Sequence, residues 1–263
     1  MAELVAQTPW WILTAYVSAF FVSMTALGLA IGFALERAMP KLRIWSDPIP
    51  DGQFRHEAIG NLVFVGTTIA VFTAVLASSL PRFGDDGAAR AIGTFSALYV
   101  GFQLHFYLLH RALHHPALVR FHRWHHVSRI TTPLSGQSTT FVEALGWAVG
   151  YALIPALASH LVPISANGWI AYMAFNVVGN IVGHANVEVV PKAPGLWYRS
   201  LFATVFTYHA LHHLRWTGHY GFAATWTDRL LRTEWPDWMP LYEQVVDGRP
   251  LELAKAKRVA GEG

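Results

Sequence analysis

Three tight histidine clusters in an otherwise apolar chain constrain this sequence more than any other feature. They read HRALH (110–114), HRWHH (122–126) and HALHH (209–213), and they hold eight of the fourteen histidines. Residues three and four apart share one face of a helix, so each cluster directs two or three imidazoles to one point. Eight imidazoles are too many for one tetrahedral zinc site, so the sequence predicts two metal ions side by side. The predicted ligands are His110, His114, His122, His125, His126, His209, His212 and His213.

The six histidines outside these patterns need separate interpretations. His184 ends the last apolar segment, and we interpret it as a ninth ligand, with Asn186 or Glu188 orienting imidazoles; the alternative is an interfacial residue. His115 points about 100° away from His114 on a helix and is left out. We interpret three others, His56, His160 and His219, as structural or interfacial. His105 lies inside an apolar segment, where it is either functional or bonded to a backbone carbonyl.

The composition places the chain in a membrane and limits the ligand chemistry. The chain is 53% hydrophobic and 13% charged, whereas a soluble domain is about 25% charged. It has no cysteine, which excludes disulfides, iron–sulfur clusters, thiolate-bound haem and zinc–thiolate sites. Nitrogen and oxygen atoms must therefore hold any metal.

Five apolar segments predict an all-α, multi-pass membrane bundle of about four to five spans with a histidine-rich helical cap. A span needs about 20 apolar residues, and the segments cover residues 10–35, 58–80, 91–109, 141–162 and 164–183. Only Pro163 separates the last two, so they form a hairpin, and whether it crosses fully is left open. We expect one domain, residues 1–250, and a flexible tail, residues 251–263.

The distribution of basic residues predicts the orientation. If the N-terminus is outside and all five segments cross, seventeen of the nineteen lysine and arginine residues lie inside, as the positive-inside rule requires. The same topology puts all three histidine clusters on the cytoplasmic side of what we expect to be the cell (inner) membrane. The basic residues form no patch of the kind that binds nucleic acid.

The motifs resemble those of the fatty acid hydroxylase/sterol desaturase superfamily of membrane di-iron oxygenases. The resemblance rests on HRALHHPALVRFHRWHH (110–126), YHALHH (208–213) and YGFAATWTDRLLRT (220–233). It implies two iron ions held by the eight cluster histidines, with His184 as an additional ligand. The chain departs from the family pattern at Gln103, where an acidic residue is common, and at Glu188, where some members have histidine. Glu143 resembles a structural family glutamate.

The resemblance and the membrane setting together predict O2-dependent hydroxylation of a lipid. No flavin, nicotinamide or haem-domain motif is present, so we expect a separate electron donor such as a ferredoxin or cytochrome. A basic group of residues either docks that donor or meets lipid phosphates: Arg111, Arg120, Arg123 and Arg129. Two alternatives stay open, a lipid or sterol desaturase with the same site and a non-catalytic metal-binding or metal-transporting membrane protein.

Overall fold

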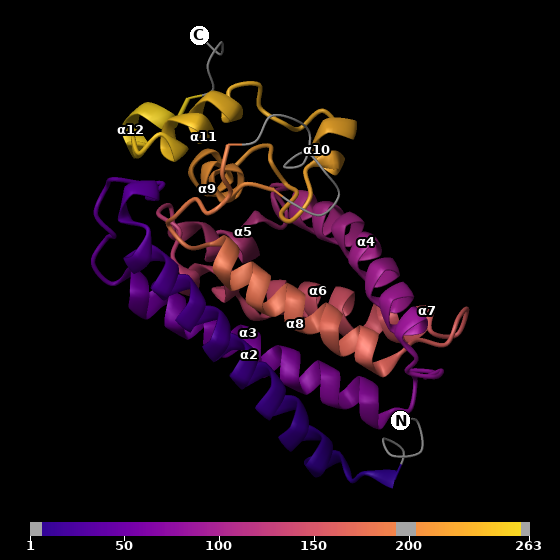
Figure 1. Cartoon of the computed structure of the whole chain (residues 1–263). Coiled ribbons are helices and arrows are strands. Elements are labelled where there is room, and N and C mark those ends of the chain that lie inside the picture. Colours follow the sequence, from indigo (N-terminus) through magenta and orange to yellow (C-terminus); the bar gives the residue numbers. More distant parts are fainter. Residues whose placement is uncertain (1–6, 193–203, 259–263) are drawn as a thin grey trace.

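A bundle of long helices with a layer of short helices at one end makes up the molecule (Figure 1). The computed structural model describes residues 7–192 and 204–258, and within these ranges it contains helices and isolated bridges but no strand, which confirms the all-α prediction. The bundle helices are α2 (Trp10–Ala38), α3 (Gln53–Ala77), α4 (Ala88–Leu113), α6 (Phe141–Ala148), the π-helical turn η4 (Val149–Leu153), α7 (Ile154–Ala158) and α8 (Ala166–Gly183).

Short helical elements form the end of the bundle that carries the histidine clusters. Between the bundle helices lie η1 (Pro40–Leu42), α5 (Val119–His122), η2 (His125–Val127) and η3 (Pro133–Gln137). The C-terminal layer consists of α9 (Phe206–Arg215), α10 (Trp226–Leu230), α11 (Trp238–Val246) and α12 (Leu253–Ala256).

Four described segments are long and apolar enough to cross a membrane. They are Trp10–Ala38, Gln53–Ala77, Ala88–Leu113 and Phe141–Ala158, close to the first four predicted spans. The predicted fifth, residues 164–183, forms α8, a helix of 18 residues that carries three asparagines. It packs against both α2 and α4.

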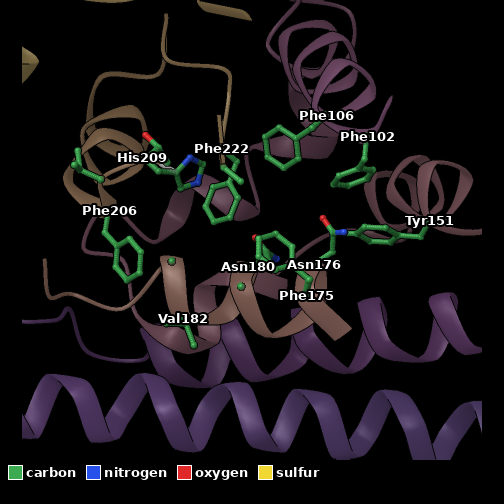
Figure 2. Close-up of a pocket in the computed structure, with 15 residues that line it drawn as sticks. Phe102, Phe106, Tyr151, Phe175, Asn176, Asn180, Val182, Phe206, His209 and Phe222 are labelled. Carbon is green, nitrogen blue, oxygen red and sulfur yellow. The ribbon is translucent and has the colours of Figure 1, made fainter. Parts of the chain in front are cut away.

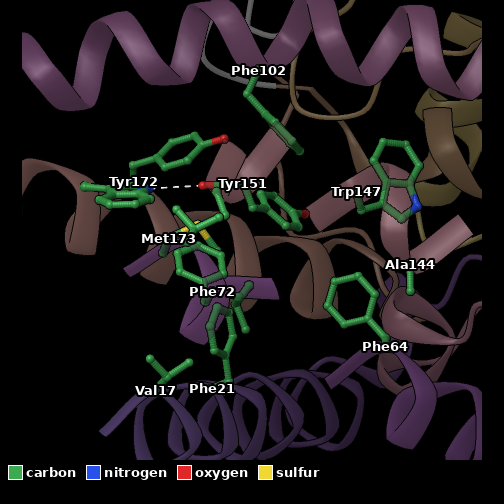
Figure 3. Close-up of a cluster of buried hydrophobic side chains, with 14 of the residues drawn as sticks. Val17, Phe21, Phe64, Phe72, Phe102, Ala144, Trp147, Tyr151, Tyr172 and Met173 are labelled. Atoms are coloured by element: carbon green, nitrogen blue, oxygen red, sulfur yellow. Dashed lines mark hydrogen bonds between the residues drawn. The ribbon is translucent and has the colours of Figure 1, made fainter. Parts of the chain in front are cut away.

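A proline shapes the fourth span and ties it to α8. Pro155 has no N–H, so it cannot bond to the carbonyl of Tyr151 one turn earlier, and its ring pushes that carbonyl aside. The indole N–H of Trp169 on α8 donates to this carbonyl at 3.0 Å, and the hydroxyl of Tyr172 donates to the carbonyl of Gly150 at 3.3 Å. The irregular turn η4 thus becomes an attachment point for α8. An aromatic core surrounds it (Figure 3).

The C-terminal layer has its own apolar core, and this core includes part of the predicted tail. Trp45, Tyr208 and Tyr242 are fully buried there. Leu251 and Ala256 are buried with them, and the carbonyl of Ala256 accepts a bond from Arg215. The packed chain therefore continues beyond residue 250, where the sequence predicted that a flexible tail begins.

A glycine on α3 provides a test of the bundle's packing. Gly60 faces the segment after η3, and a Cβ built on it would lie 2.7 Å from Cα of Ser138 and 2.8 Å from N of Thr139. We expect Gly60→Ala to destabilise the protein by about 1–3 kcal/mol, because backbone must move to admit the methyl group. Thermal unfolding in detergent measures the effect.

The matched control lies on the same helix. Gly66 is exposed, and a Cβ there meets no atom within 4 Å, so Gly66→Ala leaves the melting temperature unchanged or raises it slightly. A Gly60→Ala protein that melts at or above the Gly66→Ala protein would contradict the packing described here.

Candidate metal centre

All nine histidines named from the sequence come together at the end of the bundle, beneath the C-terminal layer. They form two groups, and in each group the possible ligand nitrogens lie within 4.8 Å of one another. The five-histidine group contains His110, His114, His122, His126 and His212, and the four-histidine group contains His125, His184, His209 and His213. Four separate segments contribute: the end of α4, the turns α5 and η2, the end of α8, and α9.

The Nε2 atoms within each group face one another at close range. In the five-histidine group, Nε2 of His122 lies 3.1 Å from Nε2 of both His110 and His126. In the four-histidine group, Nε2 of His209 lies 3.0 Å from that of His184 and 3.2 Å from that of His213. Two nitrogens bound at right angles to one ion, each at about 2.1 Å, would be about 3.0 Å apart.

The two groups are neighbours. The ring centroids of His126 and His213 are 4.9 Å apart, and those of His122 and His125 are 5.2 Å apart. Two ions held by these groups would therefore lie side by side and share one pocket.

The other ring nitrogen, Nδ1, is fixed by hydrogen bonds in seven of the nine histidines. Six donate it to a backbone carbonyl: His110 to Tyr220, His125 to Ser138, His126 to His213, His184 to Asn180, His212 to Gly218 and His213 to Ser128. The seventh, His122, donates to a carboxylate oxygen of Glu143 at 2.8 Å. Since a carbonyl only accepts, Nδ1 must carry the proton, and Nε2 presents a lone pair.

This tautomer makes the site suited to cations. Two Nε2 lone pairs that face each other at about 3 Å repel unless a cation lies between them. The Nε2 atoms of His114 and His212 are buried and have no hydrogen-bond partner, an arrangement that native proteins rarely leave unexplained. The donor sets of both groups therefore fit metal ions, and the unpartnered Nε2 atoms add to this fit in the five-histidine group.

Burial also keeps the imidazoles in the neutral form that binds metals. Loss of hydration lowers the pKa of His114 to about 2, of His184 to about 3 and of His125 to about 4. The same cause holds the pKa of the other clustered histidines on α5, η2 and α9 well below the usual value. Neutral rings need no deprotonation before they bind an ion.

Two buried carboxylates on the bundle helices α3 and α6 support these rings. Glu143 accepts from His122 and also from the indole N–H of Trp147 at 3.2 Å, so it orients a ring as well as opening α6. Glu57 accepts from the hydroxyls of Ser128 and Thr132 at 2.7 Å and 2.6 Å.

Glu57 was not among the site residues predicted from the sequence. It holds the 128–138 segment, whose backbone carbonyls at Ser128 and Ser138 fix His213 and His125. A signal for it exists, because Gln53, Glu57 and Asn61 recur every four residues and so place a polar stripe on one face of an apolar helix. The predicted span began at residue 58 and left this stripe outside.

The roles suggested for Asn186 and Glu188 as orienting partners of imidazoles are wrong. Glu188 accepts from the backbone N–H and the hydroxyl of Thr207, both at 2.8 Å, and its negative charge is favourable at the N-terminus of α9. Burial raises its pKa to about 7. Asn186 bonds to the backbone of Trp45 instead. The ring partner of His184 is the carbonyl of Asn180.

The remaining histidines have local partners. His219 bonds through both ring nitrogens, to the carbonyl of Tyr208 and the N–H of Trp235, while His56 and His160 bond to the carbonyls of Trp124 and Leu80. His105 bonds to the carbonyl of Gly146, which is the second of its two interpretations. His115 is exposed.

The segment after α9 closes the site through Asp228. Its two carboxylate oxygens accept from the N–H groups of Tyr220 and Gly221 at 2.8 Å and 2.7 Å. The carbonyl of Tyr220 in turn accepts from His110. Asp228, the acidic residue of the 220–233 motif, therefore supports the site indirectly, because it fixes the turn whose carbonyl accepts from His110.

An apolar cavity of about 240 Å³ lies between α4, α8 and the start of α9 (Figure 2). Phe102 and Phe106 line it from α4, and His209 and Phe222 line it on the histidine side. A smaller void of about 20 Å³ lies among the histidines of both groups. The two spaces share Phe106, Tyr151, Asn180 and His209 in their walls.

Comparison with known proteins gives a family model and a set of plant relatives. The family model described as fatty acid hydroxylase matches residues 95–233. The very-long-chain aldehyde decarbonylase GL1-6 of Oryza sativa subsp. indica is 33% identical over 55% of this chain and 23% of its own length. The very-long-chain aldehyde decarbonylase CER1 of Arabidopsis thaliana is 31% identical over 64% of this chain and 25% of its own.

The chain thus spans about a quarter of the length of these curated relatives. No solved structure matches the chain.

Adjacent histidines test the metal centre. His114 belongs to the five-histidine group, whereas His115 is exposed. We expect His114→Ala to bind less metal than the wild type, up to loss of one ion, because one of the possible ligands is removed. Elemental analysis of purified, metal-loaded protein measures the metal content.

The His115→Ala protein is the control, and it should keep the wild-type metal content. Equal metal loss in the two variants, or none in either, would count against the five-histidine group as a binding site.

Proposed function

Because the chain belongs to the fatty acid hydroxylase family, we propose that it is a membrane-bound di-iron oxygenase. In this proposal the enzyme hydroxylates an unactivated C–H bond of a lipid, using O2 and electrons supplied by another protein. The family match and the relatives support an oxidoreductase that acts on lipids. Iron, hydroxylation and the electron donor are the proposed parts.

The pair of adjacent histidine groups carries the proposal. The proposed ligands of one ion are His110, His114, His122, His126 and His212, and those of the other are His125, His184, His209 and His213. Imidazole suits iron, and an all-neutral donor set leaves the pair of ions strongly positive, which favours anionic oxygen species. Bound iron would supply the activation of O2 that oxidation of a C–H bond requires.

The chain's own residues position the imidazole rings and the lipid, and they exclude water. Carbonyl groups and Glu143 fix the rings through Nδ1, and eight of the nine rings are buried. The cavity lined by Phe102, Phe106 and Phe222 ends at His209, so an apolar chain bound in it would bring a C–H bond beside the histidines. Holding the reacting bond in place is worth several powers of ten in rate.

The proposed orientation puts the histidine end on the cytoplasmic side of the cell (inner) membrane. The distribution of lysine and arginine supports it, and a separate ferredoxin or cytochrome would reach the site from there. The exposed arginines on this side offer a basic surface to an acidic donor: Arg111, Arg120, Arg123 and Arg129.

A second candidate is conversion of a long-chain aldehyde at the same site. The names of the plant relatives favour it, although the chain matches only about a quarter of their length. Desaturation is a further variant of the proposed reaction, since a second C–H bond placed beside the ions would be oxidised instead.

Oxygen uptake by purified protein tests the proposal. We expect iron-loaded protein in lipid nanodiscs to consume O2 when a reductant and a long-chain lipid are both present, and mass spectrometry to find a lipid product heavier by one oxygen. His213→Ala should abolish uptake, because it removes a proposed ligand of the four-histidine group.

Three other outcomes are informative. A product lighter by two hydrogens identifies a desaturase, and a shortened hydrocarbon from an aldehyde identifies the second candidate. Protein that retains zinc alone and consumes no O2 would contradict the oxygenase and favour metal binding or transport without catalysis.

A glycine in the cavity tests whether the lipid binds there. Gly179 lines the cavity on α8, and a Cβ built on it meets no atom within 4 Å. We expect Gly179→Phe to fill the cavity and raise KM for the lipid about tenfold, the effect of displacing about two methylene groups. Steady-state oxygen uptake measures KM.

Gly101→Phe is the matched control, because Gly101 is exposed on α4 and also has open space around it. Wild-type KM in the Gly179→Phe protein would show that the substrate binds elsewhere.

A further inference from the structure

The apolar cavity contains polar atoms that no described residue satisfies. Asn176 on α8 lines the cavity and is 8% exposed. Its Nδ2 donates to the carbonyl of Tyr172 at 2.8 Å, and its Oδ1 has no described donor. Asn180 donates through Nδ2 to the carbonyl of Gly136, and its Oδ1 likewise has none. The hydroxyl of Thr204, in the same wall, is buried without a partner.

The two asparagines form a row that leads to the histidines. They are four residues apart, so they share one face of α8, about 5–6 Å from each other. Asn180 lines both the larger cavity and the small void among the histidines. Asn176 lines only the larger cavity, beside Tyr151 (Figure 2). A head group bound at Asn176 would therefore be only a few bonds from a carbon beside the histidines.

The charge of the cavity wall restricts the head group further. None of the described residues that line the cavity is a lysine, an arginine, an aspartate or a glutamate. Against these described residues a carboxylate, phosphate or ammonium group would lose its hydration without gaining an opposite charge, which is strongly unfavourable. An amide oxygen is in contrast a good acceptor for a hydroxyl or an N–H group.

We infer that the substrate is an uncharged lipid whose head group donates a hydrogen bond, through a hydroxyl or an amide N–H, to Asn176 and Asn180. The head group enters the cavity, and oxidation occurs within a few carbons of it, on the part of the chain next to His209. This inference rests on the proposed function and specifies the class of lipid on which it acts.

Binding of a matched ligand series tests the inference without turnover. The probes are 1-hexadecanol, hexadecanamide, hexadecanal, palmitate and hexadecane, each at the same mole fraction in detergent micelles that contain the iron-loaded protein without reductant. Ligand-dependent thermal stabilisation gives apparent Kd values. We expect the alcohol and the amide to bind about tenfold more tightly than hexadecane, the effect of about one net hydrogen bond.

Asn176→Leu keeps the approximate shape of the side chain but removes the acceptor. In this variant the preference for the alcohol and the amide over hexadecane should fall to near one, while binding of hexadecane stays unchanged or improves. Asn167→Leu is the control, because Asn167 is exposed at the other end of α8; it should keep the wild-type preference. The wild-type ligand series stands by itself if Asn176→Leu fails to fold.

Three results would overturn the inference: palmitate that binds as tightly as hexadecanol, hexadecanal that binds more tightly than both donors, or an unchanged preference in folded Asn176→Leu. Each of these leaves the proposed function intact if lipid-dependent oxygen uptake persists. Conversely, a protein that shows the preference but consumes no O2 would contradict the oxygenase alone.

Discussion

The packing of nine imidazoles in one place, eight of them buried, is the constraint on which the rest of the structure depends. Each neutral ring has one donor and one acceptor nitrogen, and both need partners once water is excluded. In seven of the nine rings the protein satisfies the donor nitrogen, mostly with backbone carbonyls, and leaves the acceptor lone pair facing inward. This arrangement requires backbone carbonyls on three segments to be correctly placed at the same time: the 128–138 segment, the end of α8 and the turn after α9. The fold of the cap is thus largely the scaffold for those carbonyls.

Three buried carboxylates also hold the segments that carry the rings. Glu143 contacts a ring directly, Glu57 anchors the 128–138 segment through hydroxyls, and Glu188 fixes the N-terminus of α9. None of the three forms an ion pair with a described lysine or arginine. Their oxygens instead accept hydrogen bonds from donors whose position matters for the site, so a buried polar network of this kind specifies one arrangement of the cap.

The sequence predicted the parts of this architecture that depend on periodicity. Clustered histidines at helical spacing pointed to the nine rings, and long apolar runs pointed to the bundle. The partners of the rings were not predictable, because every residue type carries a backbone carbonyl. Nothing in the sequence distinguishes Ser128, Gly218 and Tyr220 as residues whose carbonyls accept from a histidine ring. Glu188 illustrates the reverse error: its spacing from His184 suggested a shared helix face, but α8 ends at Gly183 and the chain turns away. The asparagines of α8 were visible, yet only the packed helices show that two of them face a cavity.

The boundary between the cavity and the histidines divides the candidate site into two parts. The small void is lined by rings of both groups, including His110, His122, His125 and His184, whose positions are fixed by the hydrogen bonds described above. Among the residues that the structure describes, the larger cavity shares Phe106, Tyr151, Asn180 and His209 with it. Under the proposed function, changes on the far side of that boundary would alter which lipid chain fits without disturbing a ring. Changes at the boundary would alter which carbon faces the ions, and displacements on the scale of an ångström there would decide the outcome of the proposed reaction. The choice of substrate would therefore be separable from the chemistry, and α8 lines both spaces.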